Sequence, residues 1–295
     1  MTRYLVTGAG GQLGADLLPV LSGVDGAEVR GVARSEVDVS VQSEVDACVA
    51  DWRPDVVLNA AAYTAVDAAE SDEAAARAAN AAAPAYLAAA CAAVGAKLVH
   101  VSTDYVFDGT ARSPYPVDAP VAPATAYGRT KLAGEQAVRA ALPDRSYVVR
   151  TAWVYGAAGK NFVKTMARLE AERDTLTVVA DQIGSPTWSA DLARGLVALS
   201  RSAAPAGIYH CTNAGQASWC DFARAVFTEL GADPARVRPI TTDQYPVPAP
   251  RPAYSVLSSA EWTAAGLPAL PDWRDALHRA FATVGDAFRP VKQPS

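Results

Sequence analysis

Cysteine, histidine and long apolar runs are all scarce in this chain. Its 295 residues include four cysteines and three histidines. The cysteines form no CxxC pair, and none stands at metal-ligand spacing from a histidine, which argues against a zinc site; they lie at positions 48, 91, 211 and 220. We therefore expect four reduced thiols in a cytoplasmic protein.

Signals for export, membrane insertion and nucleic-acid binding are also lacking in the sequence. The start, MTRYLVTGAG, has neither the basic nor the apolar segment of a signal peptide. The alanine-rich stretch from Ala74 to Ala93 is interrupted by Arg77, Asn80 and Pro84, so it predicts a packed helix rather than a membrane span. The formal net charge of -5 argues against a nucleic-acid partner. We expect neither a membrane nor a nucleic acid among the partners.

What the chain does contain is ample apolar material in an alternating order. Hydrophobic residues make up 51% and charged residues 19%, which is typical of a globular protein with a large core. Strand and helix patterns alternate through the first half, and this order predicts an α/β fold with a Rossmann-type doubly wound parallel sheet. The predicted strands are Arg3–Thr7, Glu28–Ala33, Val56–Asn59, Lys97–Ser102 and Ser146–Thr151; the predicted helices are Gln12–Leu21, the alanine-rich stretch and Tyr127–Ala141.

The second half has shorter elements and more proline, as in the segment YPVPAPRP at 245–252. We interpret it as a smaller carboxyl-terminal lobe over the carboxyl ends of the sheet strands, where open α/β sheets bind ligands. The dinucleotide-binding domain is expected mainly at 1–155 and the substrate-binding lobe mainly at 156–295, with some chain exchange between them. The elements predicted here are helices Asn161–Glu172, Ser189–Arg201, Ser218–Glu229 and Asp272–Val284, and strands Thr175–Val179 and Gly207–Cys211.

The first predicted strand leads directly into a glycine motif of the form GxxGxxG. Glycine permits a tight turn and a close approach of the backbone to a pyrophosphate, and the helix that follows offers free N–H groups. The position between a strand and a helix is the one that dinucleotide binding requires. The residues expected to bind the cofactor there are Gly8, Gly10, Gly11, Gln12, Leu13 and Gly14.

The segment after the second predicted strand bears on the choice of cofactor. Sites specific for NAD usually place an acidic residue at the ribose, about 20 residues beyond the glycines. Here the strand ends in Ala33-Arg34-Ser35. Arginine pairs with a 2′-phosphate, so Arg34 favours NADPH over NADH, or tolerance of both. Asp38 and Val39 follow shortly after and are expected at the adenine.

A hydroxyl, a phenol and an ammonium group form the predicted catalytic set. Thr103 comes directly after the fourth predicted strand, and Tyr127 and Lys131 lie four residues apart on one face of a helix. A nearby ammonium is expected to stabilise the phenolate and to lower the tyrosine pKa. The phenol can then exchange a proton with a substrate oxygen that Thr103 also reaches.

These motifs resemble the extended short-chain dehydrogenase/reductase superfamily and, within it, the dTDP-4-dehydrorhamnose reductases. The resemblance covers nearly the whole chain, and its most specific parts are AVDAAES, STDYVF and RTAWVYG. The motifs that carry it are GAGGQLG (8–14), NAAAYTAVDAAES (59–71), VSTDYVFDG (101–109), YGRTKLAGE (127–135), RTAWVYG (150–156), KNFVKTM (160–166), DQIGSPT (181–187) and RPAYSVL (251–257).

The resemblance implies a role for each matching residue. Tyr127 would give a proton to the C4 oxygen of a sugar, Lys131 would hold the nicotinamide ribose, and Thr103 would bind the reacting oxygen. The cofactor would also be contacted by Tyr127 and lined by Ala62, Tyr63 and Thr64. The sugar nucleotide would be bound by Val66, Thr103, Asp104, Tyr105, Tyr127, Trp153, Asn161 and Arg251, with Lys160 as a further candidate for the dTDP group.

The implied reaction is the NAD(P)H-dependent reduction of dTDP-4-dehydro-6-deoxy-L-mannose to dTDP-L-rhamnose. An alternative is a related 4-ketoreductase that acts on another dTDP-4-keto-6-deoxysugar in antibiotic biosynthesis. A dehydratase or epimerase of the superfamily is disfavoured, because dehydratases carry an Asp-Glu pair after the threonine and here Tyr105 follows Asp104. A non-catalytic protein, like the regulatory subunit of methionine adenosyltransferase, is disfavoured because the catalytic set is intact.

Some members of the family are described with Mg²⁺ held by glutamates at a dimer contact. The matching segments here read Gly14-Ala15-Asp16 and Ser189-Ala190-Asp191, with alanine where a glutamate is expected. Mg²⁺ requires several oxygen ligands in a strict geometry, so the sequence argues against metal binding at this place. A homodimer remains open as the assembly.

Overall fold

A six-stranded parallel sheet forms the centre of the larger lobe in the computed structural model, which describes residues 1–289. The strand order is β10-β5-β4-β3-β1-β2, so the chain changes direction across the sheet between β1 and β3. Ligands bind α/β sheets at such a switch point, beyond the carboxyl ends of the strands. The strands are β1 (Thr2–Thr7), β2 (Ala27–Val32), β3 (Val56–Asn59), β4 (Lys97–Thr103), β5 (Ser146–Thr151) and β10 (Gly207–His210).

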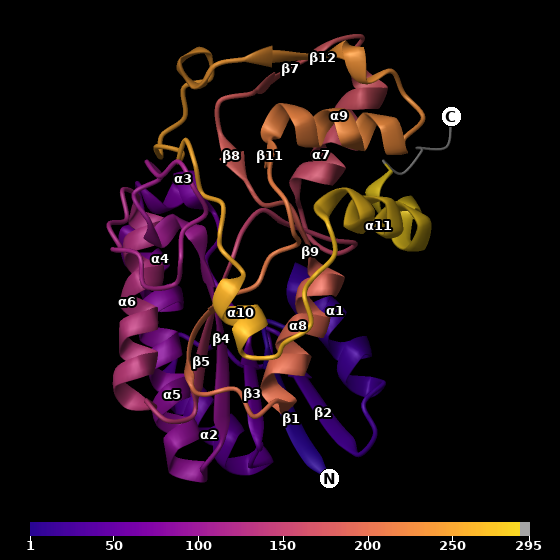
Figure 1. The fold of residues 1–295 in the computed structure, drawn as a ribbon. Helices are drawn as coiled ribbons and strands as arrows, with labels where there is room; N and C mark the ends of the chain where they lie inside the picture. The colour runs from indigo at the N-terminus through magenta and orange to yellow at the C-terminus, as the bar shows by residue number, and fades with distance from the viewer. Residues whose placement is uncertain (290–295) are drawn as a thin grey trace.

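Helices cover both faces of this sheet, as the alternating sequence predicts (Figure 1). Successive strand residues point to opposite faces, so Tyr4 and Val6 join one apolar core and Leu5 joins the other. The first core is covered by α1 (Gln12–Ser22) and α8 (Ser189–Arg201), and the second by α2 (Gln42–Trp52), α5 (Ala83–Val94) and α6 (Ala126–Ala141). The doubly wound architecture is therefore confirmed.

The alanine-rich stretch is not one regular helix. It consists of α4 (Glu73–Arg77), a π-helical turn (Ala78–Ala82) and α5, and the short helix α3 (Val66–Ala69) precedes it. Pro84 lies at the start of α5. Proline has no N–H and its ring crowds the carbonyl four residues earlier, which accounts for the irregular turn before it.

The smaller lobe lies above the carboxyl ends of the strands in Figure 1. Its core is rich in aromatic side chains, among them Phe222, Phe227 and Trp273. Its helices are α7 (Phe162–Glu172), α9 (Trp219–Glu229) and α11 (Trp273–Phe288). Its short strands form the pairs β6 (Val154–Tyr155) with β9 (Thr187–Trp188), β8 (Ile183–Gly184) with β11 (Ala217–Ser218), and β7 (Leu176–Val179) with β12 (Val237–Ile240).

Part of the second half of the chain returns to the larger lobe. Strand β10 pairs with β5 in the main sheet, α8 packs against α1, and α10 (Ala260–Ala264) contacts β10. A short apolar strand is stabilised where it finds a parallel partner, and the free edge of β5 supplies one. The segment from α8 to β10 therefore belongs to the sheet domain although it lies beyond residue 155. Residues 290–295 of the predicted second lobe lie outside the described part of the chain.

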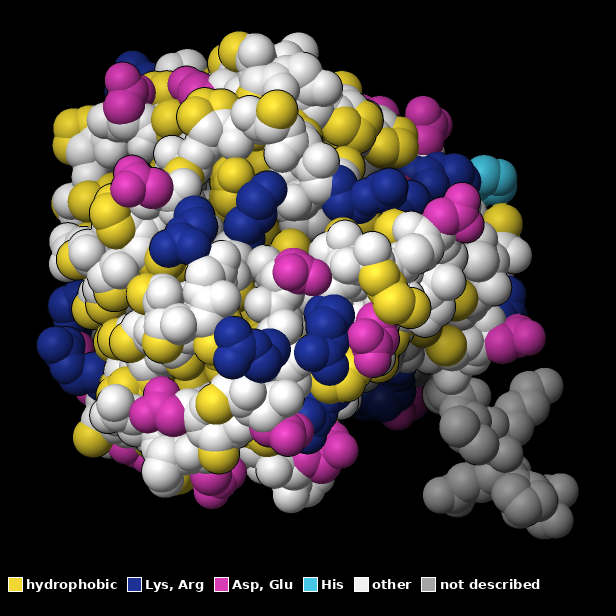
Figure 2. All heavy atoms as spheres, turned by 90° about the horizontal axis from the view of Figure 1, so that it is seen from below, with side chains coloured by type: hydrophobic (Ala, Val, Ile, Leu, Met, Phe, Trp, Pro, Cys, Tyr) yellow, Lys and Arg dark blue, Asp and Glu magenta, His cyan; other side chains and the backbone are white. Residues whose placement is uncertain are grey.

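The surface at the amino ends of the strands carries both signs of charge. Figure 2 shows this face with Lys and Arg side chains interspersed with Asp and Glu. A surface of this kind generates no strong field of one sign. Within residues 1–289, every helix is too short or too polar to cross a lipid bilayer.

A buried ion pair fixes helix α6 to the sheet. The Arg150 guanidinium of β5 meets the Glu135 carboxylate of α6 at 2.7 Å, and both side chains are 3% exposed. The Ser102 hydroxyl at the end of β4 donates to the same carboxylate. The Arg150 Nη1 group also donates to the Val117 carbonyl at 3.1 Å, so the buried charges are satisfied from several directions.

Glu135→Gln keeps the shape of this side chain but leaves the Arg150 charge buried without its partner. We expect the free energy of unfolding to fall by about 3 kcal/mol, measured by urea denaturation. The matched control is Glu73→Gln, which removes an exposed pair between α4 and Arg129 of α6; there we expect a loss below about 1 kcal/mol. Equal losses in the two variants would contradict this role of the buried pair.

Candidate active site

The glycine loop after β1 forms one wall of a cavity of about 650 Å³. Gly8 has φ +72°, and a Cβ atom at Gly14 would lie 2.2 Å from the Gly8 carbonyl oxygen, so neither position accepts a side chain without distortion. Helix α1 begins beside the loop, and its amino end has no side-chain cap, which leaves N–H groups for a ligand. Sequence-predicted residues that line the cavity are Gly8, Gly10, Gly11, Arg34, Asp38, Val39, Ala62 and Tyr63.

Leu13, Gly14 and Gln12 do not line this cavity. Leu13 packs into the core between the sheet and α1, and Gly14 lies against the loop backbone. The Gln12 amide donates to the Val154 carbonyl at 2.9 Å and accepts from Asn161 at 2.9 Å. These residues therefore support the loop or join the two lobes. Their position in the glycine motif does not distinguish such supporting roles from direct contact with the cofactor.

Arg34 lies at the rim of the cavity and is held there by Asp38. Its side chain is 86% exposed, and its Nε group is 3.3 Å from the Asp38 carboxylate. Hydrogen bonds from Ser40 and then the Arg34 charge keep the pKa of Asp38 below its ordinary value. The guanidinium is thus placed at the rim with its Nη groups accessible to an anion.

Asn80 positions the second wall of the cavity, a role that the sequence did not reveal. Its side chain accepts from the Tyr63 amide at 2.9 Å and donates to the Tyr63 carbonyl at 3.0 Å. It also donates to the Thr130 hydroxyl of α6 at 3.2 Å. The only signal in the sequence was a polar residue inside an alanine-rich helix.

Thr64, which was predicted to bind the cofactor together with Ala62 and Tyr63, does not line the cavity.

Thr103 and Tyr127 meet at the carboxyl edge of the sheet. Thr103 ends β4, and Tyr127 lies in the first turn of α6, which Thr125 caps. Burial raises the pKa of Tyr127 to about 12, although a hydrogen bond with Thr103 opposes this shift. The phenol is therefore protonated at neutral pH.

Lys131 does not have the effect on Tyr127 that the sequence predicts. Its ammonium group is buried and donates to the Val101 carbonyl at 2.6 Å. Burial lowers the pKa of Lys131 to about 8, while the neighbouring Glu135 opposes this change. Loss of solvation outweighs the Thr103 hydrogen bond at Tyr127 and the Glu135 charge at Lys131, so the expected lowering of the Tyr127 pKa is wrong.

Asp104 and Tyr105 surround the Thr103–Tyr127 pair. Asp104 is 2% exposed and accepts from the Thr103 hydroxyl at 2.9 Å. Burial raises its pKa to about 6, and hydrogen bonds from Ser255 and Thr103 oppose the shift. The Tyr105 ring meets the Tyr127 ring edge-on at 5.5 Å. The Tyr127 phenol therefore lies in a poorly solvated environment.

An ion pair joins the two lobes beside Tyr105. The Arg251 guanidinium lies 2.7 Å from the Asp67 carboxylate of α3, next to the predicted substrate residue Val66. The Ala249 amide donates to the other oxygen of Asp67 at 3.2 Å. Asp67 was not singled out in the sequence, because its partner lies far along the chain.

Three other predicted residues have separate environments. Asn161 caps α7, and its amide also donates to Gln12, so its polar atoms are already used within the protein. Lys160 is exposed. Trp153 follows β5 and stacks on Trp219, with ring centroids 3.5 Å apart. Of these three, Trp153 is the one whose side chain is fixed by packing while it stays partly accessible.

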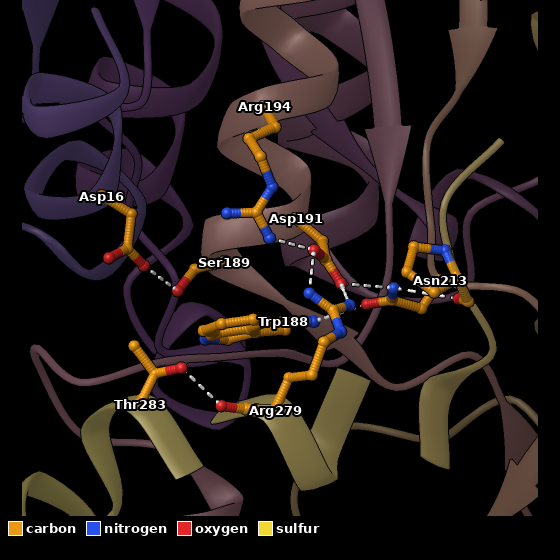
Figure 3. Close-up of polar contacts among 9 residues, drawn as sticks. Asp16, Trp188, Ser189, Asp191, Arg194, Asn213, Arg279 and Thr283 are labelled. Atoms are coloured by element: carbon orange, nitrogen blue, oxygen red, sulfur yellow. Dashed lines mark hydrogen bonds and ion pairs between the residues drawn. The ribbon is translucent and has the colours of Figure 1, made fainter. Parts of the chain in front are cut away.

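The residues at the expected Mg²⁺ position do not fit a metal site. Figure 3 shows Asp16 accepting from the Ser189 hydroxyl and Asp191 surrounded by two guanidinium groups. The Arg279 guanidinium binds Asp191 at 2.6 Å, and Asn213 donates to it at 2.9 Å. Cationic side chains thus hold the carboxylate that a metal would need. Among residues 1–289, no cluster of three acidic, cysteine or histidine side chains suited to a metal is present.

The doubly wound sheet, the glycine-loop cavity and the Thr103, Tyr127 and Lys131 set define a nucleotide-binding α/β protein of the short-chain dehydrogenase/reductase type. The chain belongs to the family whose model is described as the RmlD substrate binding domain, which matches residues 2–285.

Comparison with known proteins supports this membership over nearly the full length. The chain is 54% identical to dTDP-4-dehydrorhamnose reductase of Streptomyces griseus, over 99% of this chain and 97% of the relative. It is 50% identical to a probable dTDP-4,6-dihydroxy-2-methyloxan-3-one 4-ketoreductase of Streptomyces antibioticus, over 98% and 97% of the two chains. The crystal structure of dTDP-4-dehydrorhamnose reductase from Bacillus anthracis in complex with NADP superposes with a TM-score of 0.91 and 38% identity, over 95% and 99% of the chains.

The raised pKa of Asp104 predicts an unusual dependence of stability on pH. The folded-state pKa of about 6 exceeds the ordinary value of 3.8, so the folded protein binds a proton more readily than the unfolded chain. The stability from this proton is present below the unfolded pKa and is lost as the pH rises through about 6. Asp104→Asn is therefore expected to stabilise the protein at pH 8, by at most about 3 kcal/mol.

The measurement is urea unfolding of both proteins at pH 5 and pH 8, where the difference at pH 5 should be about half as large. Asp108→Asn is the control with the opposite sign, because hydrogen bonds from Tyr115 and Thr110 keep the pKa of Asp108 below its ordinary value. Equal destabilisation of Asp104→Asn at both pH values would show that the ionised carboxylate stabilises the fold.

Proposed function

We propose that this protein is an NADPH-dependent reductase that converts the C4 ketone of dTDP-4-dehydro-6-deoxy-L-mannose to the hydroxyl of dTDP-L-rhamnose. The observation that carries the proposal is the pairing of buried Thr103 with half-buried Tyr127 at the carboxyl edge of the sheet, in the same lobe as the glycine-loop cavity. The relative of Streptomyces griseus, 54% identical, carries the name of this activity. The structural neighbour from Bacillus anthracis binds NADP.

The chain's own residues account for the proton half of the reduction. When bound in the cavity, the nicotinamide cofactor supplies a hydride. Tyr127 donates the proton to the C4 oxygen, and its pKa of about 12 keeps the phenol protonated at neutral pH. The Thr103 hydroxyl, which in this structure donates to the Asp104 carboxylate at 2.9 Å, would turn its donor to the same oxygen when substrate is bound. The Lys131 ammonium, which now contacts the Val101 carbonyl, would bind the nicotinamide ribose.

The substrate would lie between the two lobes, with residues 1–155 mainly binding the cofactor and residues 156–295 mainly binding the dTDP group. Val66, Asp104, Tyr105 and Trp153 would surround the sugar. Arg251 would reach the diphosphate from its place beside Asp67, with exposed Lys160 as a second cation. Asn161 would support the joint between the lobes, because its amide is bound to Gln12.

A second candidate is a 4-ketoreductase for another dTDP-4-keto-6-deoxysugar. The relative of Streptomyces antibioticus, 50% identical, carries a name of this kind. Steady-state rates of NADPH oxidation with the L-mannose-configured substrate and with dTDP-4-keto-6-deoxy-D-glucose discriminate between the two. We expect the higher kcat/KM for the first substrate, and the reverse order would favour the second candidate.

We also place the enzyme in the cytoplasm, in agreement with its four free, buried cysteines.

Tyr127→Phe tests the assigned proton donor. The variant keeps the ring and removes the hydroxyl, so we expect kcat to fall by about 100-fold or more, while the dissociation constant of NADPH stays unchanged. Tyr245→Phe is the control, because this tyrosine is 60% exposed and lies outside the proposed site. Turnover of Tyr127→Phe at the wild-type rate would contradict the proposal.

Arg34→Ala tests the preference for NADPH. Loss of the guanidinium is expected to raise the KM for NADPH by about tenfold, the size of one charge-assisted hydrogen bond, and to leave the KM for NADH within about twofold. Arg201→Ala, at an exposed residue of α8, is the matched control. Equal changes for both cofactors would show that Arg34 does not bind a 2′-phosphate.

A further inference from the structure

Trp153 has a backbone conformation that its surroundings must enforce. Its φ is +47°, and Arg53 is the other non-glycine residue with positive φ within residues 1–289. Arg53 ends helix α2 in the left-handed conformation, which is a common helix ending. Trp153 ends no helix; it lies between β5 and β6. Because this conformation is strained for a bulky residue, packing of the side chain has to compensate for it.

The Trp153 indole is packed between the Trp219 ring and the backbone of Gly184. On one face it stacks on Trp219, with ring centroids 3.5 Å apart and planes 7° apart. On the other face lies Gly184, where an added Cβ would be 2.4 Å from Cε2 and 2.6 and 2.7 Å from its neighbours Nε1 and Cζ2. A point nearest Cε2 and slightly farther from both neighbours lies above the ring rather than beyond its edge. Gly184 therefore approaches the face opposite Trp219.

Trp219 itself is rigidly supported. It is the first residue of α9, which begins with a capping box between Ser218 and Asp221. Its ring packs against Phe162 of α7 at 4.6 Å and lies 6.4 Å from the Phe222 ring. The stack therefore connects helix α9 of the second lobe to Trp153, which follows strand β5 of the main sheet.

This packing leaves only the edges of the indole for a ligand. Trp153 is half-buried, and no side-chain hydrogen bond within residues 1–289 involves its Nε1–H group, which is not among the fully buried unpaired atoms. The residue lies two positions after Thr151, which pairs with Thr103 across β5 and β4. Trp153 therefore leaves the sheet beside the proposed catalytic threonine with a free donor group.

We propose that Trp219 and Gly184 are positioning residues that hold Trp153 edge-on to the sugar site, so that Trp153 binds substrate through its Nε1–H donor rather than through an aromatic face. The inference rests on the proposed function, since it takes the ligand to be a sugar nucleotide. The donor would bind an oxygen of that ligand. Trp219 does not touch the substrate and acts through Trp153.

Trp219→Leu removes the stacking ring and keeps an apolar side chain. We expect the KM for the sugar nucleotide to rise about tenfold, the cost of one lost hydrogen bond, with kcat and the NADPH dissociation constant within about twofold. Trp219→Phe, which keeps a stacking ring, should restore most of the lost affinity. Trp52→Leu is the matched control, because Trp52 lies in α2 against the Arg3 guanidinium, at the amino ends of the sheet strands and thus at the edge opposite Thr103.

A second pair of variants changes the opposite face of the Trp153 indole or the indole itself. Gly184→Ala introduces a methyl group that overlaps the indole, and Trp153→Phe keeps a ring but removes the donor. Each should raise the KM about as much as Trp219→Leu does. The double variant Trp153→Phe/Trp219→Leu should show no further increase, because both substitutions remove the same interaction. A wild-type KM in Trp219→Leu, or fully additive effects in the double variant, would overturn the proposal.

A crystal structure of Trp219→Leu separates this proposal from the proposed function. Without the stack, Trp153 is expected to leave the positive-φ region, whatever substrate the protein reduces. If the wild-type protein reduces no 4-keto sugar nucleotide, the proposed function fails while this structural result still stands. If Trp153 keeps both its φ and its ring position in the variant, the positioning role is overturned.

Discussion

The carboxylate of Glu135 determines where helix α6 lies on the sheet. It binds Arg150 of β5 and Ser102 of β4 at one buried point, where water cannot compete. Tyr127 and Lys131 precede it on the same helix at intervals of four residues, so they share its face. The contact that holds the helix therefore also brings Tyr127 to Thr103 at the end of β4.

Burial then sets the protonation states of the site. It raises the pKa of Tyr127 to about 12 and that of Asp104 to about 6, and it lowers that of Lys131 to about 8. A protonated phenol suits a reductase, whose tyrosine must give a proton rather than take one. The same burial would make a tyrosinate costly after the reaction, which favours its rapid reprotonation. Solvent exclusion thus keeps the phenol in the proton-donor form that the proposed reduction requires.

Local patterns in the sequence predicted the features that depend on neighbouring residues. The strands β1 to β5, the glycine turn and the spacing of Tyr127 and Lys131 are all of this kind. Some chain exchange between the lobes was expected, but the return of β10 in particular was not predicted, because a strand's partner is set by a free sheet edge far away in sequence. The supports of the site were missed for the same reason: Asn80 contacts Tyr63 and Thr130, and Trp219 stacks on Trp153. The prediction that Lys131 lowers the pKa of Tyr127 was wrong, because helical spacing does not reveal how strongly burial desolvates both groups.

The central claim is that a hydride and a proton are added across the C4 ketone of a dTDP-linked 6-deoxysugar. The most direct measurement uses NADPH deuterated at both hydrogens of nicotinamide C4, with dTDP-4-dehydro-6-deoxy-L-mannose as substrate and NMR analysis of the product. The account predicts dTDP-L-rhamnose with deuterium at C4 of the sugar. A product without deuterium, or with deuterium at any other carbon, would contradict it.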